Sequence, residues 1–172
     1  MKLKQMLPLA LLLALLATSC TTVRVATDYD RNVNFSEYQS FAFYRPGIDK
    51  AKISDLDKKR ILRAIDTELS AKGMTKAENP DVLVSIFTKE SERVDVYNNN
   101  YGWGWGWNPW WYGGSTVARS TEGTLYIDLI DAKKNELVWQ GIGSADLITS
   151  GDVDKKVKRI NEIVHEILLK YP

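Results

Sequence analysis

Near the middle of the chain, residues 97–114 form a segment that cannot belong to a folded core. Glycine alternates with three tryptophans in this segment, and the turn dipeptide Asn108-Pro109 follows them. Glycine weakens a strand because it has no side chain to pack, and proline cannot donate to the hydrogen-bond ladder. The segment is therefore predicted to be a long loop between two strands, and the core must come from the sequence on either side.

This loop holds five of the six tryptophans of the chain, and four interpretations of it stay open. It is most simply a low-complexity insertion whose rings pack on one another or on the sheet. The alternatives are a surface for a protein partner or for self-association, a contact with the membrane interface, which Trp and Tyr prefer, and a platform for stacking on sugars. In these three cases the candidate binding residues are the aromatic side chains Tyr101, Trp103, Trp105, Trp107, Trp110, Trp111 and Tyr112.

The first nineteen residues are typical of a secretory signal peptide. A basic start precedes an apolar run over residues 7–17, which is too short to span a bilayer, since about 18 apolar residues are needed for that. Small residues then lead to Cys20, the only cysteine of the chain. This junction resembles the lipobox of bacterial lipoproteins. The resemblance implies cleavage after residue 19, acylation of the Cys20 thiol and a short lipidated tether, residues 20–22.

Acylation of Cys20 predicts firm attachment to a membrane, because each buried methylene contributes about 0.8 kcal/mol and lipoproteins carry several acyl chains. No acidic residue follows Cys20 directly. By resemblance to the sorting of known lipoproteins, this favours the outer membrane of a bacterial envelope, with the folded body facing the periplasm. The aromatic loop reaches this membrane only if it leaves the sheet at the anchored end.

Residues 23–172 are predicted to form a single α+β domain. Helical spacing of apolar residues predicts one helix from Ser54, whose side chain caps it, to Gly73, and a second from Val153 to Tyr171. Apolar–polar alternation predicts strands at 23–27, 38–44, 81–87, 123–130 and 137–141. After residue 87 the alternation continues weakly through Val94 and Val96. Asn135 is expected to take a left-handed conformation in the hairpin between the last two strands. The expected architecture is a single mostly antiparallel sheet with two helices packed on one face.

Several of these segments together resemble a known family of bacterial lipoproteins, the family described as domain of unknown function 4136. The resemblance covers nearly all of the chain after Cys20 and rests on residues 29–43, 81–84, 123–132, 137–141 and the terminal helix ending in Tyr171-Pro172. It implies an envelope lipoprotein of α+β type. It carries no established activity that could be transferred to this chain.

The composition excludes several classes of function. Lys and Arg number 23 against 22 Asp and Glu, so the chain has no excess of basic residues with which to bind nucleic acid. One cysteine and one histidine rule out Cys-rich and multi-His metal sites, and no motif predicts a cofactor. His165 lies beside the apolar stripe of the last helix and is expected at or near the surface. Asp128 and Asp131 share one hairpin and are interpreted as ordinary strand and turn residues.

The prediction is therefore a lipid-anchored envelope protein that acts as a non-catalytic binding or structural module, with the aromatic loop as its contact surface. Its expected partners are the membrane, through the lipid on Cys20, and an envelope protein or glycan. A glycan- or lipid-binding protein that uses the same loop is the first alternative. A hydrolase is a weaker one, and it would require a pocket with convergent, buried ionisable groups.

Overall fold

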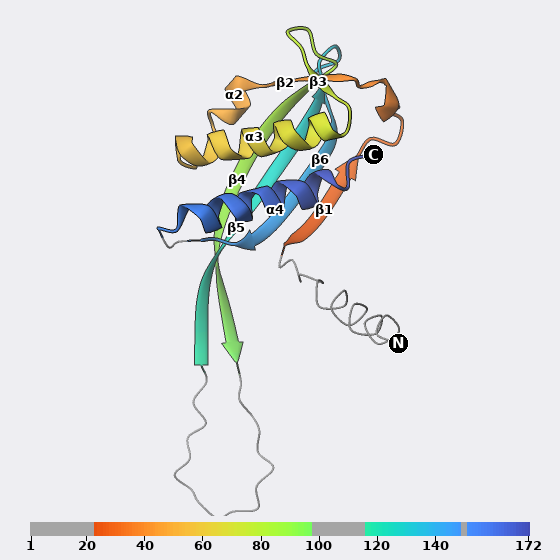
Figure 1. Cartoon of the computed structure of the whole chain (residues 1–172). Helices are drawn as coiled ribbons and strands as arrows, with labels where there is room; N and C mark the ends of the chain where they lie inside the picture. The colour runs from red at the N-terminus through yellow and green to blue at the C-terminus, as the bar shows by residue number, and fades with distance from the viewer. Residues whose placement is uncertain (1–22, 98–115, 149–150) are drawn as a thin grey trace, which may run out of the picture.

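The structure, a computed structural model, describes residues 23–97, 116–148 and 151–172. Its strands are β1 (Arg24–Tyr29), β2 (Ser40–Phe43), β3 (Thr75–Lys76), β4 (Val82–Tyr97), β5 (Thr116–Asp131) and β6 (Glu136–Asp146). Its helices are η1 (Phe35–Glu37), α2 (Arg45–Ile48), α3 (Asp55–Ala71) and α4 (Val153–Leu168). All six of these strands belong to one sheet, in the order β1-β6-β5-β4-β2-β3. The long helices α3 and α4 lie side by side in front of it (Figure 1).

The fold class is α+β, as predicted, but the sheet is mixed and not mostly antiparallel. β1, β6, β5 and β4 pair antiparallel in succession. β2, in contrast, runs parallel to both β4 and β3. The connection after β2 explains this direction. α3 carries the chain back to the end of the sheet where β2 starts, so β3 and β4 run in the same direction as β2.

The residues predicted to begin and end helix α3 and to form the β5–β6 turn take the conformations expected of them. The backbone N–H of Asp57 donates to Ser54 Oγ at 3.1 Å, which caps the start of α3. Gly73 follows α3 with a φ of +89°, and Asn135 takes a φ of +56° in the hairpin between β5 and β6. Each of these positions needs a particular local conformation, and the residue type that favours it is present.

Several elements differ from the predicted ones. The short η1, α2 and β3 are additions, β6 continues to Asp146, and α4 ends at Leu168 rather than Tyr171. β4 and β5 are each 16 residues long. The weak alternation through Val94 and Val96 lies within β4, whereas β5 is twice its predicted length. The additional residues of β5 are mostly polar, and a polar strand gives little alternating pattern by which to recognise it.

The hydrophobic core lies between the sheet and the two long helices. Ile167 of α4 approaches β6 closely because Gly141 and Gly143 have no side chains. A Cβ would lie 2.3 Å from Ile167 Cγ2 at the first position and 2.7 Å from Ile167 Cδ1 at the second. The largest fully buried side chains include Trp139, Phe41, Ile65, Leu69, Ile86, Ile127 and Leu129.

Candidate functional site at the hairpin end of the sheet

β4 and β5 continue past the end of the rest of the sheet. β6 ends at Asp146, which pairs with Glu122 of β5. Beyond this point residues 92–97 of β4 pair with residues 116–121 of β5. These six pairs form a two-stranded arm, here called the hairpin arm, which projects away from the body (Figure 1). At about 3.3 Å per residue the arm is roughly 20 Å long.

β1 begins at the same end of the sheet. Arg24 pairs with Ser144 of β6, and Ser144 pairs with Thr124 of β5. Thr124 in turn pairs with Lys89 of β4, so Arg24 and Lys89 lie at the same level of the sheet. From Lys89, β4 continues for eight residues to its end at Tyr97, a length of about 26 Å. The chain that precedes Arg24 therefore enters the body where the hairpin arm leaves it.

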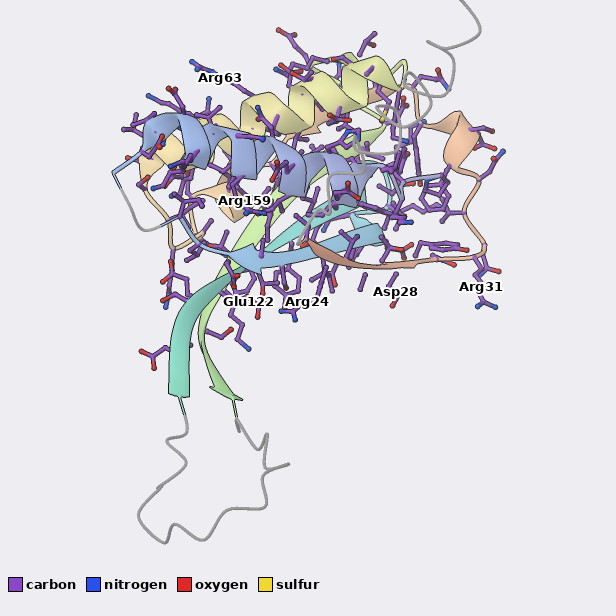
Figure 2. All side chains as sticks on the ribbon, turned by 60° about the horizontal axis from the view of Figure 1, so that its bottom comes forward. Arg24, Asp28, Arg31, Arg63, Glu122 and Arg159 are labelled. Carbon is purple, nitrogen blue, oxygen red and sulfur yellow. The ribbon has the colours of Figure 1, made fainter. Side chains whose placement is uncertain are left out.

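An ion pair joins the start of β1 to the base of the hairpin arm. The guanidinium of Arg24 contacts the carboxylate of Glu122 although β6 lies between their strands (Figure 2). The Glu122 side chain is 13% exposed and that of Arg24 57% exposed. The contact links residues 98 positions apart, and no local pattern in the sequence predicts it.

The residues predicted to contact a partner fall outside the part of the chain that the structure describes. This applies to Cys20 and to all seven aromatic candidates between Tyr101 and Tyr112. Tyr97, which was predicted to open the loop, is instead the last residue of β4 and pairs with Thr116. The lipid and the aromatic contact stay predictions, but the ends from which the chain enters and leaves residues 98–115 are both at the tip of the hairpin arm.

The two hairpin aspartates have separate structural partners. Asp131 accepts hydrogen bonds from the backbone N–H groups of Lys133 and Lys134, both at 2.8 Å, and closes the turn between β5 and β6. It also accepts one from the Tyr38 hydroxyl at 2.9 Å. Asp128 accepts a hydrogen bond from Gln140 Nε2 at 2.7 Å. These contacts hold the strands and the turn in place.

His165 and Trp139 also have partners within the body. His165 has a half-exposed side chain, and its Nδ1 lies 3.1 Å from the Glu68 carboxylate on the neighbouring helix α3. Trp139, the tryptophan that lies outside the loop, is fully buried, and its ring stands edge-on to Tyr171 with the centroids 5.5 Å apart. Both contacts join parts of the body and involve no residue of the hairpin arm.

The described residues offer neither a cluster of metal ligands nor a membrane-spanning helix. Within residues 23–97, 116–148 and 151–172, no three His, Cys, Asp or Glu side chains gather closely enough to hold a metal ion. None of the helices in these ranges is both long and apolar enough to cross a membrane.

The hydrogen-bonded carboxylates predict how stability depends on pH. Hydrogen bonds, from the backbone of Lys134 at Asp131 and from the Ser40 side chain at Asp81, hold the pKa of each carboxyl below its ordinary value of 3.8. A group with a lowered pKa stabilises the fold fully above its unfolded pKa and loses that contribution as the pH falls through its folded pKa. The free energy of unfolding, measured in urea, should therefore decrease as the pH falls below about 4. A profile that stays flat between about pH 5 and pH 2 would contradict this assignment.

The family of the chain follows from comparison with known proteins. The body is an α+β sheet covered by two long helices and extended by a projecting hairpin. Residues 25–172 match the family described as domain of unknown function (DUF4136), and the chain belongs to this family. A comparison with curated proteins finds no match.

Several solved structures are similar to this chain at low sequence identity. A PDZ domain protein from Parabacteroides distasonis is 18% identical with a TM-score of 0.51, over 95% of this chain and 40% of that protein. The PelC dodecamer from Paraburkholderia phytofirmans is 13% identical with a TM-score of 0.48, over 86% of this chain and 95% of PelC. A minor lipoprotein from Acinetobacter baumannii is 9% identical with a TM-score of 0.39, over 77% of this chain and 88% of that one. The chain thus spans less than half the length of the PDZ domain protein, and that likeness concerns the fold.

Proposed function

We propose that this chain is a lipid-anchored protein of the bacterial envelope, a non-catalytic module whose aromatic segment contacts the membrane that holds its lipid. The observation that carries the proposal is the direction of the hairpin arm, which leaves the sheet at the end where β1 begins. Cys20 precedes Arg24 by four residues. An acylated Cys20 and the aromatic segment between Tyr97 and Thr116 are therefore attached to the same end of the body.

The relative lengths of the tether and of the arm support this contact. Four residues of extended chain span at most about 14 Å, whereas β4 continues for about 26 Å past the level of Arg24. The arm thus extends further in the direction of the anchor than the tether does. A bilayer that holds acyl chains on Cys20 would meet the arm before it met the rest of the body.

The sequence of the arm favours a position at the membrane surface. Arg93, Asp95 and Arg119 belong to the arm, and charged side chains are costly in the hydrocarbon interior. Tryptophan and tyrosine, by contrast, prefer the level of the lipid headgroups. The arm therefore lies in the headgroup region in this proposal, and the tryptophans beyond its tip supply the apolar contact.

Tryptophan emission tests the proposal on the chain carrying Cys20→Ser, which has no thiol to acylate. We expect vesicles of phosphatidylethanolamine and phosphatidylglycerol to shift the emission to shorter wavelength, because indole rings leave water for the interface. The matched control changes the five loop tryptophans to serine and keeps Trp139, which is already fully buried. Its emission should not respond to vesicles. The loop tryptophans are Trp103, Trp105, Trp107, Trp110 and Trp111.

The same titration separates the alternatives. Fragments of peptidoglycan or polysaccharide replace the vesicles in a second series. A loop-dependent shift with glycan alone would contradict membrane contact and support an envelope glycan-binding protein. The absence of any loop-dependent shift with vesicles and glycans would contradict both and favour a protein partner, which crosslinking in the envelope would identify.

A further inference from the structure

A cavity lies on the helix side of the sheet, close to the base of the hairpin arm. Its volume is about 520 Å³, which is within the range of pockets that bind small molecules. Its walls come from three parts of the fold: the first two turns of α3 and first three turns of α4, with Ile53 just before α3; the central part of β4 with the facing part of β5; and the connection after β6.

Most of the cavity wall is aliphatic. Gly123 contributes to this wall by its lack of a side chain, because a Cβ there would lie 2.4 Å from Leu147 Cδ2. Leu147 can therefore lie across β5. Thr88 also lines the cavity, and its Oγ1 is buried and has no hydrogen-bond partner among the described residues. The aliphatic side chains are Ile53, Ile61, Leu125, Leu147, Ile148, Ile160 and Ile163.

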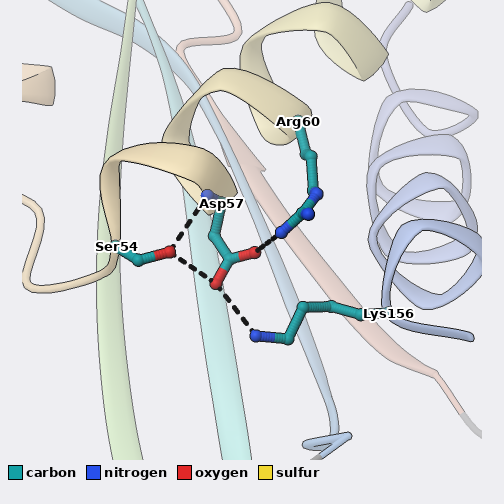
Figure 3. A network of polar contacts seen from close by, with 4 residues as sticks. All are labelled: Ser54, Asp57, Arg60 and Lys156. Carbon is teal, nitrogen blue, oxygen red and sulfur yellow. Dashed lines mark hydrogen bonds and ion pairs between the residues drawn. The ribbon is translucent and has the colours of Figure 1, made fainter. Parts of the chain in front are cut away.

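The charges at the cavity are arranged so that Lys156 is the cation best placed to meet a ligand. Asp57 lies opposite it on α3, and the Lys156 Nζ is 3.2 Å from Asp57 Oδ2 (Figure 3). Asp57 is also held by Arg60 at 2.6 Å and by the Ser54 hydroxyl at 2.9 Å. Burial opposes ionisation of Asp57, but these hydrogen bonds outweigh it and keep the pKa of its carboxyl below the usual range. Arg60 thus compensates Asp57 from outside the cavity wall, which leaves Lys156 able to exchange Asp57 for another anion.

The charged residues that line the cavity include one more cation than carboxylate. Lys89 and Arg159 line it besides Lys156, against Asp57 and Glu90. Arg159 also pairs with Glu162 of the same helix at 3.4 Å. The opening of the cavity is therefore suited to an anion, and its wall to a hydrocarbon chain.

We propose that this cavity binds a single-chain amphiphile with one anionic head group. The alkyl chain lies against the aliphatic wall, and the head group accepts hydrogen bonds from Lys156. A carboxylate and a phosphate monoester share this chemistry. The proposal is independent of the membrane contact of the aromatic segment, because it uses only residues of the body.

Isothermal titration calorimetry of the Cys20→Ser chain with dodecanoate and with dodecyl phosphate, each below its micelle concentration, tests the proposal. We expect one molecule to bind per chain, with a negative heat-capacity change because apolar surface is buried. The tighter of the two probes identifies the head group. Dodecyltrimethylammonium has the same chain with a cationic head and should not bind. Equal binding of the cationic probe, or no binding of either anionic probe, would overturn the proposal.

Variants place the ligand in the cavity. Lys156→Gln should weaken binding by about tenfold, since a charge-assisted hydrogen bond is lost. The matched control is Lys158→Gln, because this lysine of the same helix has a side chain 79% exposed and lies outside the cavity wall. Asp57→Asn should tighten binding, because it releases Lys156 from its carboxylate partner.

Two further variants test the position of the ligand at the aliphatic wall, away from Lys156 and Asp57. Ile160→Trp fills the cavity and should abolish binding, provided that circular dichroism shows a folded chain. Leu147→Glu places a negative charge on the wall at a side chain that is 37% exposed, so it should abolish binding with little effect on folding. Unchanged affinity in both folded variants would overturn the assignment of the ligand to this cavity.

Discussion

Trp139→Ala is expected to lower the free energy of unfolding by about 3–5 kcal/mol. Trp139 is fully buried, stands edge-on to Tyr171, and fills the space beside Gly141, where a Cβ would lie 2.4 Å from its ring. The side chain thus joins β6 to the C-terminal end of the chain. Because domains of this size have a total stability of about 5–15 kcal/mol, the variant should lose a large part of it.

Urea unfolding followed by far-ultraviolet circular dichroism measures this effect. The matched control is Leu137→Ala, two residues earlier in the same strand, where the side chain is 52% exposed. Its effect should stay within about 0.5 kcal/mol. Equal losses in the two variants would contradict the position of the core described above.

The second large effect on the free energy of unfolding is expected at Asp131, and the same substitution at nearby Asp128 should differ from it. Asp131→Asn should lower the free energy of unfolding by about 1–3 kcal/mol, because bonds to a buried charged acceptor become weaker neutral ones. Three donors depend on this carboxylate: the N–H groups of Lys133 and Lys134, and the Tyr38 hydroxyl.

Asp128→Asn should have no such cost. Burial raises the pKa of Asp128, and Gln140 is its one hydrogen-bond donor in the described part of the chain. The amide oxygen of asparagine can accept the same bond, and the penalty for burying a charge disappears. At pH 7 this variant should be as stable as the parent chain or more stable. Similar losses for both variants would show that the two carboxylates do not differ in the way the hydrogen bonds indicate.

The sequence predicts those parts of the fold that depend on local conformation. Ser54 before α3, Gly73 after it and Asn135 in the hairpin are each recognisable because their own backbone requirements select the residue type. The family resemblance read from the sequence is likewise confirmed by the match over residues 25–172.

The direction in which strands pair depends on contacts that no local pattern contains. β2 and β4 run parallel because of the path the chain takes through α3 between them. The outer part of β4 was predicted only as a weak alternation through Val94 and Val96, and the outer part of β5 was not predicted. An arm without a covering helix needs no continuous apolar face, so its periodic signal is weak.

The sequence predicts which residues make up the candidate site but not where the site lies on the fold. The aromatic residues between Tyr97 and Thr116 stand out in the sequence, whereas the end of the sheet from which they leave is fixed by the register of β1, β6, β5 and β4. The Arg24–Glu122 ion pair and the cavity beside Lys156 join segments that are distant in the chain. Such features are set by tertiary structure and could not be predicted from spacing.

Quenching of tryptophan emission by brominated phospholipids tests the proposed membrane contact most directly. The acylated chain, reconstituted in vesicles, is held at the membrane by its lipid, so quenching reports only whether the aromatic segment reaches the bilayer. We predict strong quenching by bromine near the carbonyl end of the acyl chains, weaker quenching by bromine near the methyl end, and none when the five loop tryptophans are serine. Emission that is unaffected by bromine at every depth would contradict contact between this segment and the membrane.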